Sequence, residues 1–300
     1  MTTETVFQPP RQTGLLIHGG LAILLLGGSA VSLIAALNRE AGSYFVLLLL
    51  LSLGLLPPAA LAVYRGYALL QASYTLERDG LRLRWGLRGE DIPLSEIEWV
   101  RPATDLGYHL PLPPFAIPGA ILGKYTLKDL GVVEFIASET TTLLLVATPE
   151  RIFAISPEDP NRFMRNFQRA MELGSLTPLE SHSTVPAAFL QRIWADRAAR
   201  YMLMAGLGLT LILFILTGIA IPSLNNVSLG YDLNAQPLEP AAPERLLLLP
   251  TLAAMTLTGD LILGMYFYRK VHHRPAAYLL WSSGIITPAL LIVAVLIILI

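Results

Sequence analysis

The sequence has no cysteine and few charged residues. Cysteine is absent from all 300 residues, which excludes disulfides, thiolate metal sites and a cysteine nucleophile. Charged side chains make up 14% of the chain and hydrophobic ones 54%, whereas about a quarter of a typical soluble domain is charged. A soluble fold could not bury so much apolar surface, so we expect the lipid bilayer to cover part of it.

A basic excess and the common catalytic signatures are also missing. The formal net charge is −1, whereas a dedicated nucleic-acid-binding protein carries a surplus of basic residues. The chain has no phosphate-binding glycine loop, no nucleophile elbow and no zinc motif. We therefore predict a non-enzymatic protein with no catalytic residues, no cofactor, no metal site and no nucleic-acid partner.

Five apolar stretches are long enough to cross a hydrocarbon core of about 30 Å, which takes roughly 20 helical residues. They are residues 14–37, 44–64, 201–221, 246–268 and 276–300. The second contains Pro57-Pro58, which a membrane helix tolerates with a kink if neighbours satisfy the freed carbonyl groups. The pattern predicts five transmembrane helices.

Lysine and arginine residues near the ends of these stretches predict their direction, because they collect on the cytoplasmic side. One side has only Arg39 and Arg245. The other side has Arg11, Arg65, Arg192, Arg197, Arg200, Arg269, Lys270 and Arg274. This bias predicts a multi-pass protein of the inner (plasma) membrane, with the N-terminus in the cytoplasm and the C-terminus outside.

The predicted organisation has four parts. Residues 1–72 hold an N-terminal tail and the first two transmembrane helices. Residues 73–174 form a cytoplasmic domain, and residues 175–200 a linker with an interfacial helix. Residues 201–300 hold the last three transmembrane helices, with an outer loop at residues 222–245.

Residues 73–174 have the period-2 alternation of β-strands. Leu81 and Leu83, for example, alternate with arginines, and they follow Asp79-Gly80, a dipeptide typical of a two-residue hairpin turn with positive φ. At the end of the segment, Asp159 can cap a helix that has an apolar stripe. About seven strands and this helix predict an α+β protein whose soluble part is a small β-barrel with a C-terminal helix.

This segment resembles the bacterial pleckstrin-homology (PH) domain family. The matching stretches are residues 74–86 (YTLERDGLRLRWG), residues 92–97 (IPLSEI), Pro118-Gly119 with Gly123, and residues 155–160 (ISPEDP). The resemblance covers about a third of the chain. It implies a seven-stranded PH-like barrel with its C-terminal helix, in a protein class associated with bacterial membranes and of mostly unassigned role.

The last two apolar stretches resemble the helix pair of small bacterial membrane proteins of unknown function. The matching residues include Gly264, Tyr268-Arg269 and residues 277–281 (AYLLW). Those proteins often carry a His-Phe-Asn motif in the preceding outer loop. This chain has YDLN at residues 231–234 instead, so a role of that histidine does not carry over.

Two groups of residues in the soluble segment are candidates for binding. Arg78, Arg82 and Arg84 loosely resemble the spaced basic residues with which PH domains hold lipid phosphates, and arginine suits bidentate phosphate contact. The hairpin is too short for a deep cradle, however, and outward arginines on a strand are usually solvated side chains. Residues 102–123 form a long loop with Tyr108, His109 and Phe115, which would serve as a binding lip, lie on the barrel end or enter the bilayer.

Asp260 lies inside the fourth apolar stretch, where a charge costs a few kcal/mol and is often functional. The structural alternative is a hydrogen bond to Thr256 or Thr258, on its own or a neighbouring helix. The leading hypothesis is a scaffold or regulator whose PH-like domain binds a protein segment or lipid headgroup at the inner leaflet, with membrane lipids, a protein partner or a second copy as partners. The alternative is a transporter or membrane enzyme that uses Asp260.

Overall fold

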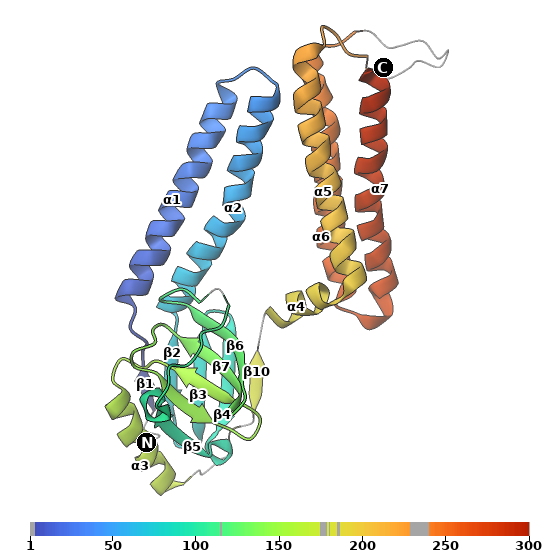
Figure 1. Cartoon of the computed structure of the whole chain (residues 1–300). Helices are drawn as coiled ribbons and strands as arrows, with labels where there is room; N and C mark the ends of the chain where they lie inside the picture. The colour runs from blue at the N-terminus through green and yellow to red at the C-terminus, as the bar shows by residue number, and fades with distance from the viewer. Residues whose placement is uncertain are drawn as a thin grey trace. The chain divides into compact units, whose positions relative to one another are not determined.

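The structure is a computed structural model that describes residues 4–114, 116–174, 179, 181–184, 187–228 and 240–299. It has a β-sheet domain and five long apolar helices (Figure 1). The chain divides into two compact units, Met1–Leu26 with Leu56–Pro186 and Gly27–Leu55 with Ala187–Ile300. The α+β class is therefore confirmed.

Five helices are long and apolar enough to cross a membrane, as the hydropathy pattern predicts. They are α1 (Gln12–Leu37), α2 (Ser43–Leu70), α5 (Arg197–Ala220), α6 (Leu248–Tyr268) and α7 (Arg274–Leu299). Helix α2 continues through its two prolines to Leu70, six residues beyond the predicted end. The extension is explained by burial, because Ala68 and Leu69 belong to the hydrophobic core of the β-sheet domain.

The strands form two five-stranded sheets. The first sheet has the order β1 (Thr5–Phe7), β2 (Ser73–Leu76), β3 (Gly80–Trp85), β4 (Arg88–Pro93) and β10 (His182–Thr184). The second sheet has the order β5 (Trp99–Pro102), β8 (Leu144–Ala147), β9 (Ile152–Ile155), β7 (Gly131–Ala137) and β6 (Ile121–Leu127). All pairs are antiparallel except β7 with β9.

The prediction of a closed seven-stranded barrel is wrong, because the two sheets are not joined into one ladder. Two short strands from outside the predicted domain occupy the edges of the first sheet: β1 pairs with β2, and β10 pairs with β4. A hydrogen bond between side chain and backbone links the sheets instead, since the buried Tyr74 hydroxyl donates to the Ile136 carbonyl at 2.7 Å. Burial raises the pKa of Tyr74 and keeps this donor protonated.

The core between the sheets is closed by helix α3 (Pro160–Leu173), which begins and ends where the sequence predicts. The Asp159 side chain accepts from the backbone N–H of Arg162 at 2.8 Å, and Gly174 ends the helix at φ +67°. Phe163 and Phe167 are buried in the core. The predicted stripe therefore packs against the sheets through its two phenylalanines, whereas Met171, its third member, is 47% exposed.

The β2–β3 hairpin forms, but its predicted turn geometry is wrong. Leu76 pairs with Leu81 and the Glu77 N–H donates to the Gly80 carbonyl at 2.9 Å, so the turn lies at residues 78–79. Gly80 is the first residue of β3 and does not have a positive φ. A Cβ at Gly80 would lie 2.5 Å from the Ile92 carbonyl oxygen of β4. Glycine is needed here for the close approach of two strands.

In the second unit, α5, α6 and α7 pack together through small residues. A Cβ at Gly206 would lie 2.9 Å from the Gly284 carbonyl oxygen, and a Cβ at Gly264 would lie 2.2 Å from the Trp281 indole nitrogen. The short helix α4 (Ala187–Ala195) precedes α5, with Asp196 between them. Its Ile193 is buried with Tyr268, Ala277 and Trp281.

Candidate binding surfaces

The three arginines predicted to hold phosphate each have a partner within the protein. Arg78 donates from Nε to the Gly174 carbonyl at 2.8 Å and from Nη2 to the Leu173 carbonyl at 2.9 Å. It therefore caps the C-terminus of α3, where a positive charge is favourable. Arg78 therefore has a different role from Arg82 and Arg84, because it contacts the end of a helix and not an acidic side chain.

Arg82 and Arg84 lie on one face of β3 and are paired with acids. Arg82 lies 3.3 Å from the Glu77 carboxylate and Arg84 lies 2.6 Å from the Asp91 carboxylate. Their side chains are 39% and 41% exposed. A phosphate would have to compete with these carboxylates, so phosphate binding by this set stays a prediction that the geometry does not favour.

The long loop predicted as a binding lip covers the outer face of the second sheet. Buried residues of this face include Phe135 and Leu145, and the loop residues Leu106, Leu110 and Ala116 pack against them. The loop is therefore partly structural. Tyr108 and Leu112 project from it, each 43% exposed.

The loop also lies against strand β6. A Cβ at Gly123 would lie 2.9 Å from Pro113 Cβ, so the loop and the strand are in close contact. Tyr125 pairs with Val133 on the outer face and is 37% exposed. We call the exposed residues Tyr108, His109, Leu112 and Tyr125 the loop–β6 surface. Phe115 lies outside the described residues, and Tyr125 had no signal in the sequence beyond its place in a strand.

The loop ends against the first turn of α1. A Cβ at Gly14 would lie 2.5 Å from the Gly119 Cα, so the backbones touch. Gly119 has φ +88°, which favours glycine. At the other helix, Arg11 donates to the Ala72 carbonyl at 2.7 Å, and the Tyr64 hydroxyl accepts from the Leu87 N–H at 3.3 Å. The sheet domain is thus packed directly on the ends of α1 and α2.

A buried ion network lies between the two sheets and had not been predicted. Glu90 on β4 and Glu134 on β7 are each 2% exposed. Arg88 lies 2.6 Å from Glu134 and 3.2 Å from Glu90, while Arg151 lies 2.6 Å from Glu134 and 3.5 Å from Glu90. Lys124 adds a third cation at 3.6 Å from Glu134. Both buried carboxylates are therefore paired with cations, which indicates a structural link between the sheets.

Asp260 on α6 accepts a hydrogen bond from the Ser283 hydroxyl of α7 at 2.6 Å. The predicted threonine partners are not used, because Thr256 and Thr258 donate to carbonyls of their own helix. Within the described part of the chain, Ser283 is the hydrogen-bond partner of Asp260, and the bond joins two neighbouring helices. This geometry is that of a helix-packing contact.

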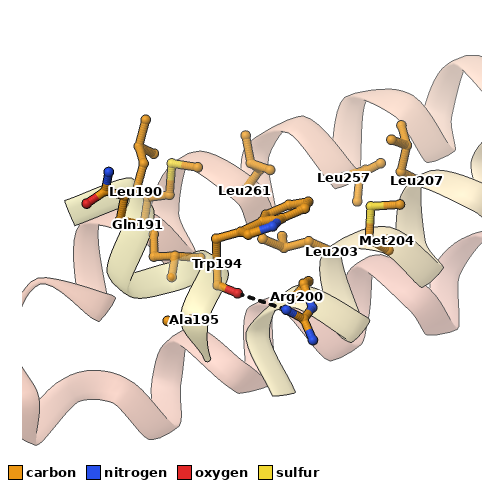
Figure 2. A pocket seen from close by; sticks show the side chains of 12 residues that line it. Leu190, Gln191, Trp194, Ala195, Arg200, Leu203, Met204, Leu207, Leu257 and Leu261 are labelled. Atoms are coloured by element: carbon orange, nitrogen blue, oxygen red, sulfur yellow. Dashed lines mark hydrogen bonds between the residues drawn. The ribbon is translucent and has the colours of Figure 1, made fainter. Parts of the chain in front are cut away.

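An apolar groove runs between α4, α5 and α6 (Figure 2). Its volume is about 750 Å³. The lining residues are Leu190, Gln191, Ile193, Trp194, Ala195, Arg200, Leu203, Met204, Leu207, Leu257, Leu261 and Met265. Arg200 is the charged member of this set, and it donates to the Trp194 carbonyl at 3.4 Å.

Comparison with known proteins identifies the β-sheet domain. A family model described as bacterial PH domain matches residues 72–171, which is 100 of the 300 residues. The resemblance drawn from the sequence is therefore confirmed for this third of the chain. Comparisons with curated proteins and with solved structures found no match.

Proposed function

We propose that the bacterial PH domain at residues 72–171 makes this protein a non-enzymatic membrane scaffold or regulator, which binds a protein segment at the inner leaflet. The domain sits in the chain between α2 and α5, two of five helices long and apolar enough to span a bilayer. The excess of basic residues near their ends favours a cytoplasmic domain. Because the domain is connected to a membrane helix at each end, it would stay at the membrane surface.

The loop–β6 surface is the observation that carries this proposal. Tyr108, His109 and Leu112 are exposed on the loop, and Tyr125 is exposed on the strand that the loop contacts at Gly123. Tyrosine is enriched where proteins bind each other, because it combines an apolar ring with a polar tip. The contact between Gly119 and Gly14 holds the end of this loop at the start of α1, so the surface would face partners close to the bilayer.

A lipid headgroup is the less favoured ligand of the domain. Arg78, Arg82 and Arg84 already contact the α3 terminus, Glu77 and Asp91. The first sheet is also a poor site for strand addition, because its edge strands β1 and β10 have three residues each and offer few backbone groups for pairing. The edge strand β6 of the second sheet borders the loop and offers a place for an extended segment.

Site-specific crosslinking tests the proposal. A photoreactive amino acid at Leu112 in the full-length protein, expressed in cells, should crosslink a discrete protein partner or a second copy. Tyr108→Ala with Tyr125→Ala should remove this product, whereas Arg82→Ala should leave it. Crosslinking to lipid alone, or a product unchanged by the tyrosine substitutions, would contradict the proposal.

A transport role for Asp260 is the second hypothesis considered. It requires a polar cavity reached by other polar groups, but Asp260 contacts Ser283 on the neighbouring helix, and α6 contributes only Leu257, Leu261 and Met265 to the lining of the nearby groove. The geometry therefore favours helix packing. Cells that carry Asp260→Asn should grow as cells with the wild-type protein do. A loss of ion flux with this single change would support the transport hypothesis instead.

A further inference from the structure

Asp196 lies at the junction of α4 and α5, here called the α4–α5 elbow, and is held by several hydrogen bonds. Its side chain accepts from the backbone N–H groups of Ala198 and Ala199 at 3.0 and 3.3 Å. It also accepts from the hydroxyls of Tyr268 on α6 and Tyr278 on α7. Four donors from three helices therefore hold one carboxylate, and the start of α5 is tied to the rest of the bundle.

Helix α4 has two apolar sides, and the bundle covers one of them. On the covered side, Ile193 is 3% exposed, and Phe189 contacts Tyr268 edge-to-face with ring centroids 6.4 Å apart. On the other side, Leu190 and Trp194 are 55% and 56% exposed. Because residues four apart lie on the same helix face, Leu190 and Trp194 form one wall of the groove.

The opposite walls belong to α5 and α6. Figure 2 shows the Trp194 indole extending from α4 toward Leu203 and Leu261. Further along α5, Met204 and Leu207 are 53% and 49% exposed. The volume of about 750 Å³ is in the range of roughly 300–1,000 Å³ that small ligands occupy. Such a groove suits a long, flexible apolar chain.

The elbow end of the groove is basic. Arg200 lines it and is half-buried, while Arg192 and Arg197 lie exposed within eight residues of Arg200. The intervening acid, Asp196, is engaged by its four donors, and the hydrogen bond from Tyr278, followed by that from Tyr268, lowers the pKa of Asp196. Arginine presents several donors to a phosphate oxygen. Charge and shape therefore indicate a ligand with an anionic head and an apolar tail.

We propose that this groove binds one acyl chain of an anionic glycerophospholipid, with the phosphate at Arg200. This inference rests on the proposed membrane insertion, but it is independent of the partner of the PH domain. The site belongs to the second unit, so lipid binding here would anchor the α4–α5 elbow at the membrane interface without using the PH domain arginines.

Quenching of Trp194 fluorescence tests the proposal in the full-length protein. The protein is placed in vesicles that contain brominated phosphatidylglycerol or brominated phosphatidylcholine, and the Trp194 signal is the difference between the wild type and Trp194→Phe. We expect the anionic lipid to reach half of the maximal quenching at an about fivefold lower mole fraction than phosphatidylcholine. A fivefold difference is the effect of about one arginine near an anionic surface. Arg200→Gln should remove this preference while quenching by phosphatidylcholine persists.

Two matched variants separate this site from other lipid contacts. Arg245→Gln changes an exposed arginine that precedes α6, far along the helix from the groove residues, and should keep the fivefold preference. Arg82→Gln in the PH domain should also keep it. Equal quenching by both lipids, or a preference that survives Arg200→Gln, would overturn the groove site alone. No quenching by either lipid would overturn it together with the proposed membrane insertion.

Discussion

At the scale of single residues, several of the polar side chains with the best-defined contacts in this protein hold elements together. Asp196 joins the start of α5 to tyrosines 72 and 82 positions away in the chain. Glu134 accepts from Arg88 and Arg151 in the narrow space between the sheets. The sequence shows these residues but not their partners, because such contacts depend on how distant segments fold together.

Asp196→Asn should lower stability in a pH-dependent way. The hydrogen bonds from Tyr278 and Tyr268 lower the pKa of Asp196 in the folded protein. The stabilisation of the folded protein by the charged Asp196 carboxylate is therefore complete above the unfolded pKa of about 3.9. It is lost as the pH falls through the lowered pKa of the folded state. Thermal unfolding in mild detergent should show a deficit of roughly 1 kcal/mol in the variant above pH 5, narrowing below pH 4. A deficit that stays constant down to pH 3 would contradict this account.

Glu134→Gln should destabilise the β-sheet domain by roughly 3 kcal/mol, because it leaves two arginines with less compensation in a buried site. Glu77→Gln is the matched control, since Glu77 pairs with the half-exposed Arg82, and a surface pair contributes less than about 1 kcal/mol. Tryptophan fluorescence during unfolding measures the loss of stability in each variant. Equal losses would show that burial of the network has no energetic consequence.

At the scale of elements, the sequence predicts those with long periodic patterns. The five apolar helices and the capped helix α3 are confirmed. Strands β1 and β10 were missed because three residues are too few to show alternation. Their pairing with β2 and β4 explains why the sheets stay separate. The loop–β6 surface was predicted only in part, since Tyr125 joins it through the contact between Pro113 and Gly123.

Packing between α6 and α7 should depend on one glycine of α6 and not on another. Gly264→Ala would place a methyl group against Trp281 and should cost about 1–3 kcal/mol. A Cβ at Gly259 would meet nothing within 4 Å, so Gly259→Ala should be neutral or stabilising by up to about 1 kcal/mol. Thermal unfolding in detergent measures the stability of both variants. A Gly264→Ala protein as stable as Gly259→Ala would show that this helix contact is not close.

At the scale of the molecule, the PH domain is joined to its first two helices without a flexible linker. Phe7 before α1 and Ala72 after α2 are buried in the domain core, and Arg11 donates to the Ala72 carbonyl. A movement of α1 against α2 would therefore disturb the core of the domain. This construction suits a module that reports or holds a position at the membrane surface, and it follows from packing that no hydropathy pattern reveals.

The side of the membrane on which the PH domain lies decides which partners it can reach. The absence of cysteine allows single-cysteine variants of the natural chain. Lys128→Cys places a thiol on an exposed turn of the domain, and Glu40→Cys places one in the exposed α1–α2 connection. With a membrane-impermeant maleimide on intact cells, we predict labelling of Glu40→Cys, and labelling of Lys128→Cys only after the inner membrane is permeabilised. Labelling of Lys128→Cys in intact cells, with Glu40→Cys protected, would contradict the account.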